Sequence, residues 1–153
     1  MRIRKHRPEE VNELAETIAE QVPLLPTYAG MDIDVDKVRR ILNGGYNEQD
    51  FMVRVLVDEH DRVVGGCGAY ASATFTKHPV TNDVFIFILP EHRSYPNAMM
   101  LINAYLEWAR LIKAQLVQTT HTGGYKNAQM NLLIMRAGFE PVGTIYHHRN
   151  EEP

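Results

Sequence analysis

The sequence has few of the features that are typical of secreted or membrane proteins. It has one cysteine, Cys67, so no internal disulfide can form, and this usage favours a reducing compartment. No apolar run approaches the roughly 18 residues that suggest a membrane span. The N-terminal segment MRIRKHRPEE has no apolar stretch after its charges, unlike a secretory signal. These absences predict a soluble, cytoplasmic protein.

A strong charge of one sign is also missing. The formal net charge of −3 gives no general attraction to nucleic acid or to an anionic membrane, so neither is expected as a partner. The basic cluster at residues 2–7 alternates around Ile3 and is interpreted as a solvated strand edge. Seven histidines are present, but none lies in a cluster with the spacing of metal ligands. His147 and His148 are adjacent on a predicted strand and would point to opposite faces. We therefore expect no metal site.

The chain of 153 residues predicts a single domain covering 1–153. It shows no repeats, linkers or low-complexity segments. The pattern predicts, in order, a strand, two helices, three strands, a helix, a strand, a helix and a strand. The expected ranges are 1–7, 9–21, 35–42, 51–57, 62–75, 84–89, a helix carrying an apolar stripe from Ala98 to Ile112, 114–121, 127–137 and 142–148.

Three glycines, Gly65, Gly66 and Gly68, fall inside the strand predicted at 62–75. They indicate a bulge or a close approach of another backbone. A dinucleotide-binding fingerprint is rejected because that motif requires a helix directly afterwards, and AYASATF is strand-like. Cys67, between these glycines, is interpreted as a small buried residue rather than a nucleophile.

A possible anion site follows the strand at 84–89, where the loop RSYPNA leads into a helix. Backbone N–H groups at a helix start can bind phosphate. The donors expected here belong to Ser94, Tyr95, Asn97, Ala98 and Met99. Arg93 adds a guanidinium, whereas Pro96 lacks an N–H but has a φ angle suited to a helix start. From these residues alone, a phosphate cradle and a plain strand–turn–helix connection both remain open.

The element order and two motifs resemble the GNAT acyltransferase superfamily, whose members move acyl groups from coenzyme A to amines. The family motif Arg/Gln-x-x-Gly-x-Gly/Ala follows a strand ending near Val-x-Pro. ILPEHRSYPNA matches it at four positions and has Pro96 in place of the first glycine. The matching residues are Ile88, Pro90, Arg93 and Ala98.

A second landmark of the family is an asparagine before a helix that ends in Gly-Phe. Asn127, Gly138 and Phe139 stand at that spacing. The resemblance covers nearly the whole chain, and LEWAR and GFEPVGTIY look similar to GNAT proteins encoded in bacteriophage genomes. It implies an α/β fold with a twisted, mixed but mostly antiparallel sheet of 6–7 strands flanked by about four helices.

The resemblance also implies a reaction, acetyl transfer from acetyl-CoA to a primary amine of a small molecule or protein. The pyrophosphate of the cofactor would lie over residues 93–99, and Asn127 would contact its pantetheine or adenosine end. Backbone N–H groups near Ile88 and Leu89 would stabilise oxyanion charge on the thioester carbonyl. No metal takes part.

An amine with a pKa near about 10 must lose a proton before or during attack. The candidate bases are Asp83, ahead of the strand at 84–89, and His121, at the end of the next strand. Asn82 fits the family register slightly better than Asp83, and a solvated loop-end aspartate is the simpler role for Asp83. Four residues before Gly-Phe, the family often has a tyrosine that acts as a general acid and protonates the departing thiolate. Ile134 stands there and cannot donate a proton.

Pro96 and Ile134 leave a second function open, a non-catalytic coenzyme A-binding or protein-interaction module built on this scaffold. The acceptor amine cannot be deduced, because neither LLPTYAGMDID nor TKHPVTND carries a recognisable chemistry. A homodimer is also left open.

Overall fold

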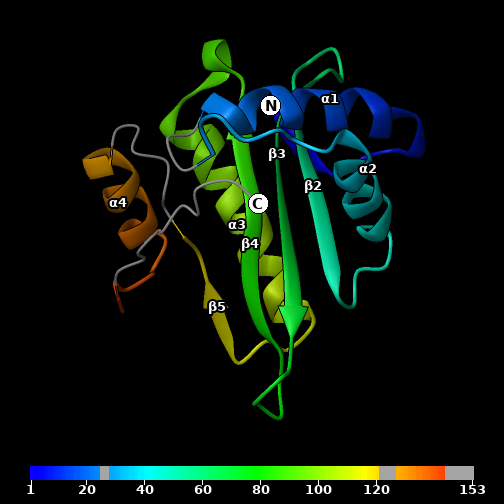
Figure 1. The fold of residues 1–153 in the computed structure, drawn as a ribbon. Helices are drawn as coiled ribbons and strands as arrows, with labels where there is room; N and C mark the ends of the chain where they lie inside the picture. Colours follow the sequence, from blue (N-terminus) through cyan, green and yellow to red (C-terminus); the bar gives the residue numbers. More distant parts are fainter. Residues whose placement is uncertain (25–27, 121–126, 144–153) are drawn as a thin grey trace.

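The computed structural model describes residues 1–24, 28–120 and 127–143, and it arranges them around one twisted sheet (Figure 1). The sheet has five strands in the order β1-β2-β3-β4-β5, with β4 and β5 parallel and every other neighbouring pair antiparallel. The strands are β1 (Arg2–Arg4), β2 (Phe51–Val57), β3 (Val63–Ser72), β4 (Val80–Ile88) and β5 (Leu116–Gln118). The α-helices are α1 (Val11–Gln21), α2 (Val35–Gly44), α3 (Tyr95–Leu111) and α4 (Asn127–Arg136).

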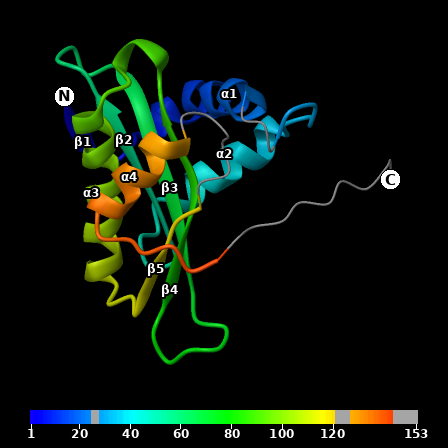
Figure 2. The same ribbon diagram turned by 90° about the vertical axis from the view of Figure 1, so that its left-hand side faces the viewer.

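The helices form layers on both faces of the sheet. Figures 1 and 2 show α1 and α2 on one face and α3 on the other. Alternate residues of β2 supply both cores, because successive side chains of a strand point to opposite faces. Met52 and Leu56 pack with the α3 core, whereas Val53, Val55 and Val57 pack with α1 and α2.

The amphipathic pattern of α3 is confirmed, with one residue that the expected stripe omitted. Leu101, Ile102, Tyr105 and Ala109 are buried as expected. Trp108 is buried too, and its indole N–H donates to the carbonyl of Glu48 at 2.7 Å. This hydrogen bond satisfies the polar end of the ring and allows the side chain to enter the core.

Two helix ends are formed by local capping residues. Asp34 caps α2 by accepting the N–H of Lys37 at 3.0 Å. At the end of α4, Gly138 has a φ of +92°, and the next N–H, of Phe139, returns to the carbonyl of Ile134 at 3.2 Å. A left-handed glycine with this backward bond ends a helix without crowding a Cβ atom.

The irregularity expected in the strand at 62–75, which is β3, is confirmed, because Leu56 pairs with Gly65 and Val57 with Val63, so Val64 is an extra residue in β3. The pairing of β3 with β4 is irregular too. Gly68 pairs with Phe85 and Ala69 with Asp83, so Val84 is an extra residue that forms a bulge in β4. The glycines also allow close packing, since a Cβ on Gly65 would lie 2.8 Å from the carbonyl oxygen of Phe87.

Cys67 lies in the same strand as these glycines. It is buried, and burial raises the pKa of its thiol to about 12. A thiol with that pKa is almost fully protonated at neutral pH, as expected for a structural residue.

The observed boundaries differ from the expected ones at three places. The strand expected at 84–89 begins at Val80, because residues 80–82 pair with β5. The strand expected at 114–121 is shorter, at Leu116–Gln118. The closing strand expected at 142–148 lies mostly outside the described residues, so the described sheet has five strands rather than six or seven. Within the described part of the chain, no helix is both long and apolar enough to cross a membrane.

Candidate functional site

The two parallel strands β4 and β5 separate beyond their first three residues. Pairing joins Val80–Asn82 of β4 to Leu116–Gln118 of β5, and no described strand pairs with the outer edge of β4 after Asn82. That open edge leads directly into the loop before α3. The backbone groups of late β4 and the start of α3 therefore face the same region.

The N–H groups expected to contact a thioester carbonyl differ in availability. Leu89 donates its N–H to the carbonyl of Val64 at 2.9 Å, so this donor is already used within the sheet. Neighbouring residues of a strand direct their N–H groups to opposite sides. The N–H of Ile88 must then point away from β3, toward the open edge, which leaves Ile88 as the better candidate of the two.

The loop between β4 and α3 is held by its own side chains. A 3-10 turn covers Pro90–His92, and Asn97 donates from Nδ2 to the carbonyl of His92 at 2.7 Å. Ser94 is the N-cap of α3, and its hydroxyl accepts the N–H of Asn97 at 3.3 Å. Asn97 is buried and Ser94 is exposed. The loop is therefore held in its conformation by its own hydrogen bonds.

These bonds reduce the number of donors expected at the start of α3. The N–H of Asn97 is taken by Ser94 Oγ and that of Ala98 by the Ser94 carbonyl at 3.1 Å. Met99 lies beyond the first turn, where N–H groups bond within the helix. The N–H groups of Ser94 and Tyr95 form no hydrogen bond within the described residues. The expectation of five free donors is wrong, and a pair remains.

Arg93 does not simply extend toward a phosphate. Its Nε donates to the carbonyl of Ile88 at 2.9 Å, across the turn at Pro90–His92. The side chain thus ties the loop to the end of β4 while the residue stays exposed. This places a guanidinium charge at the junction of strand and helix, where an anion would meet it.

Pro96 takes a position that suits its chemistry. It lies in the first turn of α3 and is exposed, at a position where an N–H would have no partner within the helix. Beside it, the ring of Tyr95 lies under the guanidinium carbon of Arg136, 5.6 Å from the ring centroid. That contact connects the start of α3 with the end of α4.

Asp83 lies within β4, one residue from the Val84 bulge, rather than in a solvated loop. Its Oδ1 accepts the N–H of Thr120 at 2.8 Å, and the side chain of Thr119 also bonds to it. Burial raises the pKa of the Asp83 carboxyl despite these hydrogen bonds. A partly desolvated carboxylate with a raised pKa is a stronger proton acceptor than a solvated one.

A buried hydroxyl close to Asp83 was not among the expected site residues. Tyr105 on α3 places its hydroxyl 2.8 Å from the carbonyl of Gln118, to which it donates, and 3.0 Å from Thr81 Oγ1. Burial raises the pKa of Tyr105, and the Asp83 charge adds to this effect. The sequence did carry a signal, because a tyrosine within an apolar stripe needs a polar partner for its hydroxyl.

Some expected residues are not settled by this geometry. Asn127 is the first residue of α4, as expected, although its side chain is outside what the structure describes. His121 lies outside the described residues, so its relation to Asp83 stays a prediction. Ile134 is partly buried in α4. Among the residues that the structure describes, no group of histidine, cysteine or carboxylate side chains is arranged to hold a metal.

Comparisons of sequence found no match, either among protein-family models or among curated proteins. Comparisons of structure found matches among solved structures. A crystal structure described as a probable acetyltransferase has a TM-score of 0.74 at 20% identity, covering 100% of both chains. The aminoglycoside acetyltransferase AAC(6')-Iy, in complex with a bisubstrate analog of coenzyme A, has a TM-score of 0.72 at 17% identity, covering 97% of both. AAC(6')-IG from Acinetobacter haemolyticus has a TM-score of 0.68 at 14% identity, covering 100% of both.

At these identities the likeness establishes the fold. The chain has an α/β, GNAT-like fold, with a five-stranded mixed sheet and four α-helices in its described part. The narrower similarity to bacteriophage proteins finds no support in the compared structures.

Proposed function

We propose that the protein is an N-acetyltransferase that moves an acetyl group from acetyl-CoA to a primary amine. The observation that carries the proposal is the position of Asp83. This half-buried carboxylate lies on β4 where the strand parts from β5, and the same strand leads into the capped start of α3. A proton acceptor on β4 and a set of anion-binding groups beyond the end of β4 thus lie along the same strand.

Groups at the start of α3 support coenzyme A binding, although fewer N–H groups are available there than the sequence motif suggested. The N–H groups of Ser94 and Tyr95 and the charge of Arg93 would hold pyrophosphate oxygens, supported by the positive end of the helix dipole. Asn127 would contact the pantetheine or adenosine part. When bound, acetyl-CoA supplies an activated thioester carbonyl, and the N–H of Ile88 would donate to its oxygen.

Asp83 would take the proton that the attacking amine must lose. Its raised pKa brings it closer to the neutral range, where a base is most effective. His121 would relay that proton to solvent, a role that suits an imidazole in general. Ile134 offers no proton, so the departing thiolate would be protonated by water or by another side chain.

The acceptor is proposed as a small-molecule amine. Compared structures include aminoglycoside 6'-N-acetyltransferases, and this makes aminoglycosides the first compounds to try. A protein amine is the other candidate acceptor.

A thiol-release assay tests the proposal. Acetyl-CoA is mixed with the protein and a panel of primary amines, and free coenzyme A is measured over time. We expect release that depends on the amine and falls strongly in Asp83→Asn, with little change in Asp50→Asn, an exposed control. If acetyl-CoA binds but no amine promotes release, the protein is the alternative, a non-catalytic coenzyme A-binding module.

A further inference from the structure

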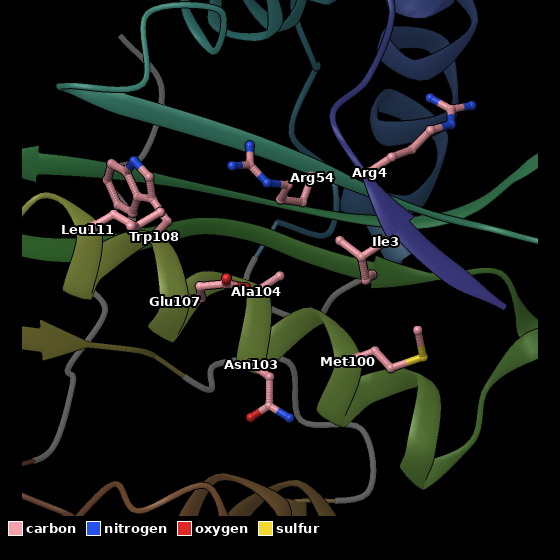
Figure 3. A pocket seen from close by; sticks show the side chains of 9 residues that line it. All are labelled: Ile3, Arg4, Arg54, Met100, Asn103, Ala104, Glu107, Trp108 and Leu111. Atoms are coloured by element: carbon pink, nitrogen blue, oxygen red, sulfur yellow. The ribbon is translucent and has the colours of Figure 1, made fainter.

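A hollow lies between α3 and the β1–β2 edge of the sheet. Its cavity of about 480 Å³ is lined by Ile3, Arg4 and Arg54 from the strands and by one side of α3. Figure 3 shows the strand residues across the hollow from the α3 side chains, among them Met100 and Glu107. None of these residues belongs to the proposed acetyl-transfer site.

Two arginines line this cavity, and their hydrogen bonding differs. Arg4 uses all five of its N–H donors, on Glu10, Asp61 and the Lys5 carbonyl. Arg54 uses Nη1 alone, on the Val53 carbonyl and in an ion pair with Glu48. The Nε–H and Nη2–H groups of Arg54 form no hydrogen bond within the described residues, although its side chain is only 15% exposed.

Those unused donors form the edge of the guanidinium that binds a carboxylate through two parallel hydrogen bonds. The local charge also favours an anion. Lys5 and Arg54 share the single carboxylate of Glu48, which leaves one positive charge in excess. The strand side of the cavity thus carries an arginine, Arg54, whose donors are incompletely paired.

The opposite wall has the opposite charge. Glu107 on α3 is exposed and forms no ion pair within the part of the chain that the structure describes. A simple carboxylate would bind Arg54 but be repelled by Glu107, whereas a zwitterion would satisfy both. The α3 side of the cavity also has apolar side chains, those of Met100, Ala104 and the largely buried Trp108.

We propose that this cavity binds an α-amino acid with an apolar side chain. Its carboxylate pairs with the Nε and Nη2 edge of Arg54, its ammonium with Glu107, and its side chain packs on the apolar wall. The proposal is independent of acetyl transfer, because it rests on residues outside that site.

Trp108 is the only tryptophan in the chain and lines the cavity, so its fluorescence reports on this site directly. Leucine is titrated without acetyl-CoA, beside isoamylamine and isocaproate, which lack its carboxylate and its amine respectively. We expect a saturable change with leucine and weaker binding of both analogues. No saturable change with leucine, or equal binding of either analogue, overturns the proposal.

Variants assign the two charges. Arg54→Lys keeps the charge beside Glu48 but loses the fork, so affinity for leucine and isocaproate should fall about tenfold or more. Glu107→Gln, an exposed substitution that spares the fold, should weaken leucine and leave isocaproate equal or stronger. Glu59→Gln, exposed and outside the cavity, is the matched control. Leucine binding that is unchanged in Glu107→Gln contradicts the assignment even if Arg54→Lys fails to fold.

Discussion

Asp83 is held by Thr119 and Thr120 in a position where its negative charge is partly removed from water. Its folded pKa is raised above the unfolded value, near about 3.9 for an aspartate. The unfolded chain therefore loses this proton more readily. The protonated carboxyl favours folding below the unfolded pKa, and that contribution is lost as pH rises through the folded pKa.

Replacing Asp83 with Asn separates catalysis from stability. At neutral pH we expect the free energy of unfolding to be equal or higher, because the amide carries no charge to desolvate. Acetyl transfer should fall by about 10²–10⁴, the usual contribution of a general base. Chemical denaturation and the thiol-release rate measure the two effects, and a collapsed fold with normal activity per folded molecule would show that Asp83 is purely structural.

Gly65 gives a second prediction for a single residue. A Cβ there would lie 2.8 Å from the Phe87 carbonyl oxygen, a backbone atom that cannot turn aside. Gly65→Ala should lower the free energy of unfolding by about 1–3 kcal/mol, as overpacking does. Gly44, at the end of α2 with open space around it, is the matched site, and Gly44→Ala should not destabilise. Equal effects in urea melts would contradict this packing.

The role of a residue could be predicted from the sequence where its interactions are with residues nearby in the chain, and not where they are with distant ones. The glycines of β3 and the caps Asp34 and Gly138 follow from local backbone chemistry, so their roles were predictable. The burial of Asp83 was not, because it arises from pairing with β5 and from threonines far along the chain. Spacing along one segment carries no information about such long-range neighbours.

At the scale of elements, the junction of β4 and α3 carries the cofactor prediction. The sequence correctly predicted a strand, a loop and a helix with Pro96 in its first turn. It overestimated the free N–H groups, because the bonds of Asn97 to Ser94 and His92 depend on how the loop folds back. A motif match identifies residue types, but it does not show which of their N–H groups already form hydrogen bonds within the protein.

Pro96→Gly tests the balance between order and donors in this turn. The unfolded chain gains freedom, so the free energy of unfolding should fall by about 0.4–1 kcal/mol. The restored N–H should leave acetyl-CoA affinity equal or higher, since charge-assisted bonds contribute about 1.5–3 kcal/mol when aligned. Pro96→Ala restores the same N–H with less added freedom and is the control. A large loss of affinity in both variants would show that the proline ring itself shapes the site.

At the scale of the whole molecule, His6 couples folding to pH. The His6 side chain is buried. Its ring stacks on the ring of Tyr46 with 4.6 Å between the two centroids, and its Nε2 lies 2.9 Å from the carbonyl oxygen of Leu42. Burial lowers the pKa of His6, with smaller opposing effects of Leu42 and Glu10 and a lowering by Arg54. Its neutral form stabilises the fold above the unfolded pKa, near about 6.5, and this contribution is lost as pH falls.

We expect the free energy of unfolding to decrease as pH falls below about 6.5, before the carboxylates titrate. His6→Gln should flatten this part of the profile, whereas His60→Gln, an exposed control, should not. Urea melts at a series of pH values measure the slope. The same slope in wild type and His6→Gln would mean that another group carries the dependence.

Acetyl transfer by this protein is tested most directly by detecting the acetylated product. The protein is incubated with acetyl-CoA labelled in its acetyl group and with the amine panel, and mass spectrometry follows the label. We predict a labelled N-acetyl amine formed in equal amount with free coenzyme A, and far less of it with Asp83→Asn. Binding of acetyl-CoA without any labelled amine, across the panel and over the pH range in which the protein is folded, would contradict the claim.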